Sequence, residues 1–199
     1  MKRIYLCLAH MSGNEQKYIQ EAFDTNWVVP LGPNVDGFEA DLQSFIAEDR
    51  QVVALSSGTA AVHLALIACG VQPGDEVCVQ SFTFCASSNP IKYIGANPIF
   101  IDSEEDTWNM DPDLLEKAIL DRIAKTGKKP KAIIPVALYG MPYDCERIMA
   151  IAEKYDIPVI EDAAEGFGSK YNGQILGTFG HYGVLSFNGN KMITTSGGG

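Results

Sequence analysis

Short apolar runs alternate with longer segments of helical periodicity along most of the chain, and this alternation limits the fold more than any other feature. The apolar runs cover residues 52–55, 76–80, 97–101, 131–136 and 157–160. The segments between them carry apolar residues at the spacing of one helical face, as in residues 111–125. Parallel strands need a crossover of a dozen or more residues, usually a helix. The pattern therefore predicts an α/β fold, a mostly parallel sheet covered by helices.

The same reading places the remaining elements. Helices are expected at residues 13–24, 35–48, 59–69, 84–93, 111–125 and 146–155, and further short strands at 181–187 and 192–195. Gly70 is the expected stop of the helix 59–69, because glycine commonly follows the last helical residue. The 199 residues are 46% hydrophobic, which is enough for one sizeable core and predicts a single domain.

The segment that joins the first two predicted helices, residues 26–33, is too apolar for an ordinary solvated loop. Two interpretations stay open. The segment packs against the core or a subunit interface, or it contacts a substrate or partner. In the second case Pro30, Leu31 and Gly32 are the substrate-binding candidates.

Charge excludes some partners. Fifteen Lys and Arg against 25 Asp and Glu give a net charge of −10, and the isoelectric point lies near 4.7. A nucleic acid or an anionic membrane surface is therefore not an expected partner. The N-terminus has only a four-residue apolar run before His10, too short for a signal peptide or a membrane span. We expect a cytoplasmic protein.

The five cysteines form no CxxC pair and are odd in number, which predicts neither a disulfide framework nor a zinc site. We interpret them as small buried hydrophobic residues. The three histidines lack partners at metal-ligand spacing, so no metal site is expected. A Walker loop and a GxSxG elbow are also absent from the sequence.

Residues just after the apolar runs are the chemical candidates, because ligands of open α/β sheets bind outside the carboxyl ends of the strands. Residues 56–59, Ser-Ser-Gly-Thr, lie between a predicted strand and a helix N-terminus, where free amides favour a phosphate. A plain helix N-cap is the more common role of such residues. Phe84 follows the next strand, where an aromatic ring could stack on a flat ligand or pack in the core; core packing is expected for Phe82.

Two further candidates follow later strands. Glu161 and Asp162 end the run 157–160, where a carboxylate could cap a turn or pair with a ring nitrogen that must stay protonated. Lys191 lies between two predicted strands. Most lysines are solvated surface residues, but an amine here could form Schiff bases.

Taken in this order, the turn at Gly58 and Thr59, Phe84, residues 161–164, and Ser186 five residues before Lys191 resemble the DegT/DnrJ/EryC1/StrS family of pyridoxal phosphate-dependent sugar aminotransferases. The similarity covers essentially the whole chain. Within the family the chain is most similar to enzymes that aminate a UDP-linked 4-keto-6-deoxy-N-acetylhexosamine. Residues 10–15, 27–33 and 186–191 carry that closer similarity.

The resemblance implies the large domain of a fold-type I, aspartate aminotransferase-like enzyme, a three-layer α/β sandwich with an N-terminal helical segment over residues 1–50. Lys191 would bond covalently to the cofactor, Asp162 would bond its ring nitrogen, and Phe84 would stack on its ring. Gly58, Thr59 and Ser186 would hold its phosphate, and Glu165 would lie near the ring hydroxyl or the sugar. Glutamate would be the amino donor, a nucleotide-linked keto-sugar the acceptor, and the product a sugar for surface glycans or glycoproteins.

The sequence also departs from the family pattern. Ala137 and Asn188 occupy places where many relatives have histidine. The resemblance further implies that residues 1–199 form part of the large domain, that a small C-terminal domain is missing, and that the full-length protein is a homodimer. From this we expect the chain alone to show little transamination. Another pyridoxal phosphate reaction, a different keto-sugar (dTDP- or GDP-linked, 3- or 4-keto) and an inactive cofactor-binding fragment remain alternatives.

Overall fold

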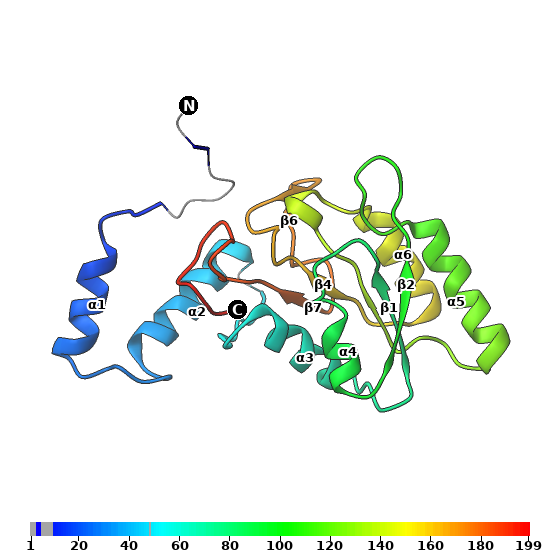
Figure 1. Cartoon of the computed structure of the whole chain (residues 1–199), viewed down its shortest axis with the longest axis horizontal. Coiled ribbons are helices and arrows are strands. Elements are labelled where there is room, and N and C mark those ends of the chain that lie inside the picture. Colours follow the sequence, from blue (N-terminus) through cyan, green and yellow to red (C-terminus); the bar gives the residue numbers. More distant parts are fainter. Residues whose placement is uncertain (1–2, 5–9, 48) are drawn as a thin grey trace.

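The computed structural model describes residues 3–4, 10–47 and 49–199, and arranges residues 58–199 as a three-layer α/β unit (Figure 1). Its main strands are β1 (Glu76–Gln80), β2 (Asn97–Ile101), β3 (Ala132–Ile134), β4 (Ile160–Asp162) and β7 (Tyr182–Val184). Its helices are α3 (Gly58–Ala68), α4 (Asn89–Tyr93), α5 (Pro112–Thr126) and α6 (Cys145–Tyr155). The alternation of strand and helix along the chain is confirmed.

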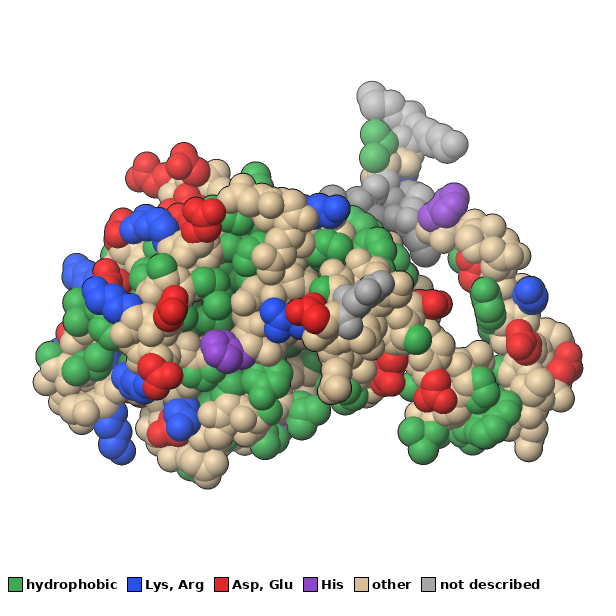
Figure 2. Space-filling view, turned by 180° about the vertical axis from the view of Figure 1, so that it is seen from behind, with side chains coloured by type: hydrophobic (Ala, Val, Ile, Leu, Met, Phe, Trp, Pro, Cys, Tyr) green, Lys and Arg blue, Asp and Glu red, His purple; other side chains and the backbone are tan. Residues whose placement is uncertain are grey.

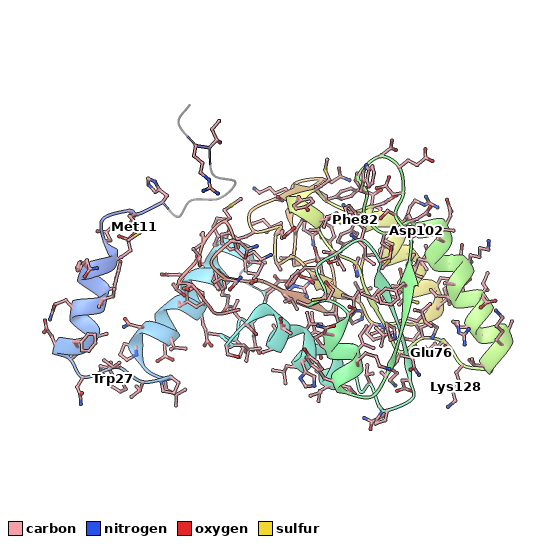
Figure 3. All side chains as sticks on the ribbon, viewed as in Figure 1. Met11, Trp27, Glu76, Phe82, Asp102 and Lys128 are labelled. Carbon is pink, nitrogen blue, oxygen red and sulfur yellow. The ribbon has the colours of Figure 1, made fainter. Side chains whose placement is uncertain are left out.

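The strands run parallel in the order β2-β1-β3, and β4 pairs in parallel with β7. Parallel bridges from Ile133 to Val159 and from Val136 to Asp162 join the two groups. All five carboxyl ends consequently meet at one edge. Figure 3 shows this polarity. Phe82 follows β1 and Asp102 follows β2, and both lie at the edge where the strands end. Glu76, at the start of β1, lies at the opposite edge.

The side-chain alternation of the strands builds one core on each face of the sheet. Val77 and Val79 of β1 pack with α3 and α4, whereas Cys78 between them packs with α5 and α6. All three side chains are fully buried. This two-sided burial explains why the strands read as continuous apolar runs.

Capping residues fix where the covering helices begin. Asp111 accepts hydrogen bonds from the amides of Asp113 and Leu114 at the start of α5, and Asp144 accepts one from Arg147 at the start of α6. These bonds satisfy amides that have no partner inside a helix.

The N-terminal segment extends away from the three-layer unit (Figure 1). It contains α1 (Glu15–Asp24), which buries no residue, and α2 (Pro33–Ile46), which buries only Leu42. In the linker between them Trp27 is 47% exposed and Leu31 73%. Of the interpretations of this linker, packing against the core of this chain is wrong, because its apolar side chains are exposed; the subunit interface and the substrate contact stay predictions. Figure 2 shows hydrophobic side chains on this arm, and acidic and basic side chains interspersed over the rest of that face.

Three expected elements differ in the structure. Residues 52–55 form no regular strand, and Leu55 instead exchanges two backbone hydrogen bonds with Gly199. Residues 192–195 form bends rather than a strand, and only Asn89–Tyr93 of the segment 84–93 is helical. A strand requires a neighbour along its whole length, so a β-prone sequence without one stays irregular. A small hairpin not foreseen in the sequence pairs β5 (Lys170–Tyr171) with β6 (Gln174–Ile175).

The cysteine prediction is correct in part. Cys78 and Cys145 are buried free thiols, and burial raises the pKa of each to about 12. Cys69 is half-buried, but Cys85 is exposed because its turn faces a cavity rather than the core. Cys7 lies outside the described residues. Every helix within the described ranges is too short or too polar to cross a bilayer.

Two fully buried amides, Gln80 and Asn109, tie together the segments that follow β1 and β3. The Asn109 Oδ1 accepts a hydrogen bond from the Leu138 amide at 3.1 Å, and its Nδ2 donates to the Met141 carbonyl at 3.0 Å. Gln80 Nε2 lies 3.4 Å from the same Oδ1. The pair therefore holds both ends of the short 3-10 turn η1 (Leu138–Gly140).

We expect Asn109→Ala to lower the free energy of unfolding by about 2 kcal/mol, because it leaves the buried Leu138 amide without this acceptor and removes a donor from the Met141 carbonyl. Urea denaturation followed by circular dichroism measures this. Asn97→Ala is the matched control, since Asn97 is exposed and its side chain bonds only the Lys92 ammonium. Equal losses in the two variants would contradict the assigned role of Asn109.

Candidate active site

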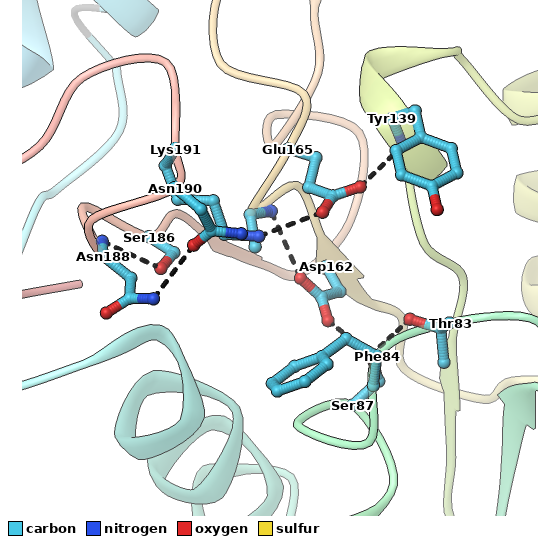
Figure 4. A network of polar contacts seen from close by, with 11 residues as sticks. Thr83, Phe84, Ser87, Tyr139, Asp162, Glu165, Ser186, Asn188, Asn190 and Lys191 are labelled. Atoms are coloured by element: carbon cyan, nitrogen blue, oxygen red, sulfur yellow. Dashed lines mark hydrogen bonds and ion pairs between the residues drawn. The ribbon is translucent and has the colours of Figure 1, made fainter. Parts of the chain in front are cut away.

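The carboxyl ends of the strands surround a cavity of about 830 Å³. Its walls come from the N-terminus of α3, the turn after β1, the end of β4 and the segment after β7. All seven residues predicted to hold the cofactor line it: Gly58, Thr59, Phe84, Asp162, Glu165, Ser186 and Lys191. Figure 4 shows five of them together with their polar contacts. Whether each plays its predicted role stays a prediction.

The turn into α3 has the N-cap considered for residues 56–59, and its phosphate-binding role stays a prediction. Ser57 is the N-cap, and its Oγ accepts a hydrogen bond from the Ala60 amide at 3.1 Å. Gly58 and Thr59 then lie at the positive end of the helix dipole, facing the cavity. A Cβ on Gly58 would stand 3.0 Å from the Cβ of Ser186, so the close approach of these two segments requires glycine. This cradle of backbone and hydroxyl groups fits an anion.

Asp162 is 5% exposed and points from the end of β4 to the cavity. Its Oδ2 accepts a hydrogen bond from Ser87 Oγ at 2.6 Å, and its Oδ1 accepts one from the Ala164 amide at 3.2 Å. Burial raises the pKa of this carboxyl, while the hydrogen bond from Ser87 and the charge of Lys191 act in the opposite direction. A buried carboxylate with one charged neighbour and open space beside it is a candidate functional group.

Glu161, the neighbour of Asp162 along β4, takes the structural role. Successive side chains of a strand point to opposite faces. The fully buried Glu161 accepts hydrogen bonds from the amides of Gly177 at 2.6 Å and Phe179 at 3.0 Å. Of the two uses considered for this acidic pair, Glu161 therefore closes a turn, and Asp162 is left to face the cavity.

Lys191 is largely buried, with 13% of its side chain exposed. Its Nζ lies 3.1 Å from Glu165 Oε1, while Glu165 Oε2 accepts a hydrogen bond from the Tyr139 amide at 2.7 Å. Tyr139 adopts a left-handed backbone conformation with φ of 52°, which is uncommon for a bulky residue. Glu165 thus holds Lys191 at the cavity and ties it to the turn η1.

Phe84 is 73% exposed and lines the cavity, as required of a ring that stacks on a ligand. The expectation that Phe82 packs in the core is wrong. Phe82 is 46% exposed and its ring lies 5.8 Å from that of Trp108. Both phenylalanines belong to a turn beyond the end of β1, and therefore project past the edge of the sheet instead of into either layer.

The structure does not bring Pro30, Leu31 and Gly32 to this cavity, because they lie in the exposed linker of the N-terminal arm. Ala137, where a histidine was noted as missing, is fully buried and does not line the cavity either. His63 packs edge-on against Tyr93 at 5.8 Å. Among the described residues no group of three or more His, Cys, Asp or Glu could hold a metal ion.

Sequence reasoning missed Ser87 and Tyr139, which contact Asp162 and Glu165. It also left the side chains of Asn188 and Asn190 without a role, although both line the cavity. All four lie in segments that follow strands, but the contacts of Ser87 and Tyr139 join segments far apart in the sequence, which the apolar pattern does not record. A second cavity of about 410 Å³, between α2 and β7, contains none of the predicted site residues.

The fold and the arrangement of these strand ends define the large domain of a fold-type I transferase. The DegT/DnrJ/EryC1/StrS aminotransferase family profile matches residues 9–199, and the chain belongs to this family.

Three curated relatives support this assignment. The chain is 54% identical over its full length to EpsN of Bacillus subtilis, which is named as a pyridoxal phosphate-dependent aminotransferase, and covers 50% of it. It is 44% identical to a GDP-perosamine synthase of Escherichia coli O157:H7, over its full length and 52% of that protein. It is 44% identical, over 72% of its length and 38% of the relative, to the UDP-2-acetamido-2-deoxy-3-oxo-D-glucuronate aminotransferase of Pseudomonas aeruginosa.

A solved structure agrees. The sugar aminotransferase Spr1654 of Streptococcus pneumoniae, in its PMP form, matches 98% of this chain with a TM-score of 0.88 and 32% identity, over 51% of that chain. The chain spans about half the length of the curated relatives it matches at full length.

The approach of Gly58 to Ser186 gives a test of the packing at this turn. We expect Gly58→Ala to lower the free energy of unfolding by about 1–3 kcal/mol, because the added methyl overpacks against the Ser186 Cβ and the Leu185 carbonyl, 3.2 Å away. Urea denaturation measures the loss. Gly189→Ala is the control, since a Cβ there meets nothing within 4 Å. A Gly58→Ala variant as stable as this control would show that the turn can accommodate the added methyl group, and would contradict the close packing assigned to it.

Proposed function

We propose that this chain carries the cofactor-binding half of an aminotransferase that transfers an amino group from glutamate to a nucleotide-linked keto-sugar, with pyridoxal 5′-phosphate as cofactor. The observation that carries the proposal is the convergence of an anion cradle, a buried carboxylate and a largely buried lysine on one cavity. The family membership and the printed names of the relatives support it.

The residues present fit this cofactor. Gly58 lets the segment that carries Ser186 approach the N-terminus of α3, so that the hydroxyl donors of Thr59 and Ser186 lie beside the free amides of that turn. The chemistry of the remaining groups also matches, because the cavity is lined by the amine of Lys191, by the carboxylates of Asp162 and Glu165, and by exposed aromatic rings that include Phe84. When bound, pyridoxal phosphate supplies an aldehyde carbon that bonds to amines and a ring that accepts electrons.

Each residue then has one task. Lys191 would hold the cofactor covalently through its amine, and when free of the cofactor the same amine would carry protons between carbon atoms. Asp162, as a buried carboxylate, stabilises a proton on the ring nitrogen. Phe84 covers one face of the ring. Glu165 holds the Lys191 ammonium while this side chain is not bonded to the cofactor, as its 3.1 Å contact indicates.

For the acceptor we propose a UDP-linked 2-acetamido-2,6-dideoxy-4-keto-hexose, on the resemblance carried by residues 10–15, 27–33 and 186–191. A GDP-linked keto-sugar is the second candidate, because relatives at 44%, 40% and 37% identity are named GDP-perosamine synthases. The product would serve surface glycan or glycoprotein synthesis.

We further propose that the full-length protein is a homodimer. The N-terminal arm supports this, since Tyr18, Phe23 and Trp27 are exposed on it and α1 buries no residue. A ten-residue helix is marginal by itself in water and needs a packing partner. In such a dimer Pro30, Leu31 and Gly32 would bind the substrate at the partner's cavity rather than at their own.

The covalent role of Lys191 gives the first test. After incubation with pyridoxal phosphate and reduction with borohydride, mass spectrometry should place the adduct on Lys191, and Lys191→Ala should lack it. Lys170→Ala, which changes an exposed lysine of β5, should keep the adduct. A stable adduct on a different lysine would refute the assignment.

The substrate is tested with the full-length protein, glutamate and a panel of UDP-, GDP- and dTDP-linked keto-sugars. We expect the highest kcat/KM with the UDP-linked 4-keto-6-deoxy-N-acetyl sugar, because the proposed contacts select for it. Sedimentation of the same preparation should show a dimer. A preference for the GDP-linked sugar would replace the first substrate by the second, and a monomer with full activity would remove the proposed role of the linker.

A further inference from the structure

Several residues of the turn that follows β1 line the cavity, and of these the sequence predicted a role in the site only for Phe84. Three residues further on, Ser87 is 1% exposed and donates a hydrogen bond from its Oγ to Asp162 Oδ2 at 2.6 Å. Asp162 lies 75 residues away in the sequence, on β4. The turn thus reaches across the cavity floor to the carboxylate (Figure 4).

The direction of this hydrogen bond follows from a proton count. Ser87 has one hydroxyl proton, and its Oγ lies 2.6 Å from the carboxylate, 2.9 Å from Thr83 Oγ1 and 3.3 Å from the Phe84 carbonyl. The carboxylate is the nearest acceptor and the only charged one, so it takes the proton. Thr83 is then the donor to Ser87, and the two hydroxyls form a chain that ends on Asp162.

This pair of linked hydroxyl groups leaves the Asp162 carboxylate able to accept a hydrogen bond from one more donor. Each of its oxygens already accepts one hydrogen bond, from Ser87 and from the Ala164 amide. A carboxylate offers about four acceptor positions. A protonated ring nitrogen can therefore bond to Asp162 without displacing either partner, and the existing bonds keep the carboxylate from rotating.

We propose that Ser87, supported by Thr83, is a positioning residue that holds the Asp162 carboxylate ionised and fixed toward the cavity. The part of this proposal that concerns the cofactor rests on the proposed function, because the position of the Asp162 carboxylate affects the chemistry only when the cofactor ring is bound. It also links ring stacking to ring protonation, since Phe84 and Ser87 belong to one turn.

The other charges near Asp162 are Lys191 and Glu165, which act on its pKa in opposite directions. Desolvation raises this pKa most, and the Ser87 hydrogen bond is the largest influence that lowers it. Removing the Ser87 hydroxyl should therefore raise the pKa of Asp162 in the absence of any ligand.

The first experiment uses the cofactor-free chain. The side-chain carboxyl carbon of Asp162 is followed by ¹³C NMR as pH is varied, in Ser87→Ala, Ser87→Thr and Ser88→Ala. Ser88 is the matched control, since its Oγ donates to the Cys85 carbonyl and not to Asp162. We expect an upward shift of the titration in Ser87→Ala, with Ser87→Thr and Ser88→Ala close to the unmodified chain. An unchanged titration in Ser87→Ala, or an equal shift in Ser88→Ala, overturns the proposal.

Thr83→Val provides a second variant in case Ser87→Ala does not fold. It removes the outer hydroxyl and leaves the Ser87 hydroxyl in place, so a smaller upward shift is expected. A Thr83→Val chain that titrates like the unmodified chain would contradict the supporting role of Thr83.

The second experiment measures the ring directly, with ¹⁵N-labelled pyridoxal phosphate bound to each variant. Asp162→Asn supplies the reference for an unprotonated ring nitrogen. We expect the Ser87→Ala signal to move toward this reference and its cofactor affinity to fall about tenfold. A Ser87→Ala signal identical to that of Ser88→Ala overturns the proposal. The absence of a Lys191 adduct in the unmodified chain would instead contradict the proposed function, while the cofactor-free titration would still decide the role of Ser87.

Discussion

Burial of two adjacent carboxylates at the end of β4 is the constraint on which the organisation of the site depends. An isolated carboxylate in a protein interior is strongly unfavourable unless hydrogen bonds compensate it. Glu161 obtains its bonds from the amides of the turn 177–180, which leads into β7. Asp162 obtains them from Ser87, after β1, and from the Ala164 amide. Because the two side chains point to opposite faces, one strand end orders both the turn that precedes β7 and the turn that carries Phe84.

The parallel sheet makes this arrangement possible. Strands that run in one direction gather their following segments at one edge, so residues more than 100 positions apart in the sequence line the same cavity. The buried amides Gln80 and Asn109 then satisfy the backbone groups that such segments leave unpaired. They hold η1 so that the Tyr139 amide reaches Glu165, which in turn contacts Lys191. The position of Lys191 consequently depends on side chains that never enter the cavity.

The sequence predicts many of the residues at this edge of the sheet, because their positions depend on where the strands end. Apolar runs mark the strand ends within a few residues. Phe84 and Asp162 each follow such a run, whereas Ser186 lies inside the expected strand 181–187 and follows the observed β7; all three line the cavity. Ser87 and Tyr139 were missed for a physical reason, since their roles come from hydrogen bonds across the sheet, and a one-dimensional pattern does not record which turns face each other. The same limit applies to residues 52–55. Their β-prone composition is real, but pairing depends on a neighbour, and here only Leu55 to Ser57 have one, at Gly198 and Gly199. For the apolar linker the sequence left two interpretations open, because apolarity indicates a need for burial and does not say which chain or ligand provides it.

Each candidate residue of the site had an ordinary structural role as its alternative interpretation, and the structure shows which residues take that role. Ser57 caps a helix, Glu161 closes a turn and His63 packs on a tyrosine ring. Asp162 and Lys191 also make local contacts, with Ser87 and with Glu165, but unlike these residues they carry charges that line the cavity. An apolar pair of similar size could fill their places without the cost of desolvating two charges. The two charged side chains are nevertheless buried here, where a cavity of about 830 Å³ opens beside both of them and beside a helix N-terminus. Groups that weaken a fold and converge on open space are expected at functional sites. The unfavourable burial of this acid and this amine is therefore stronger evidence for chemistry at the cavity than either residue type by itself.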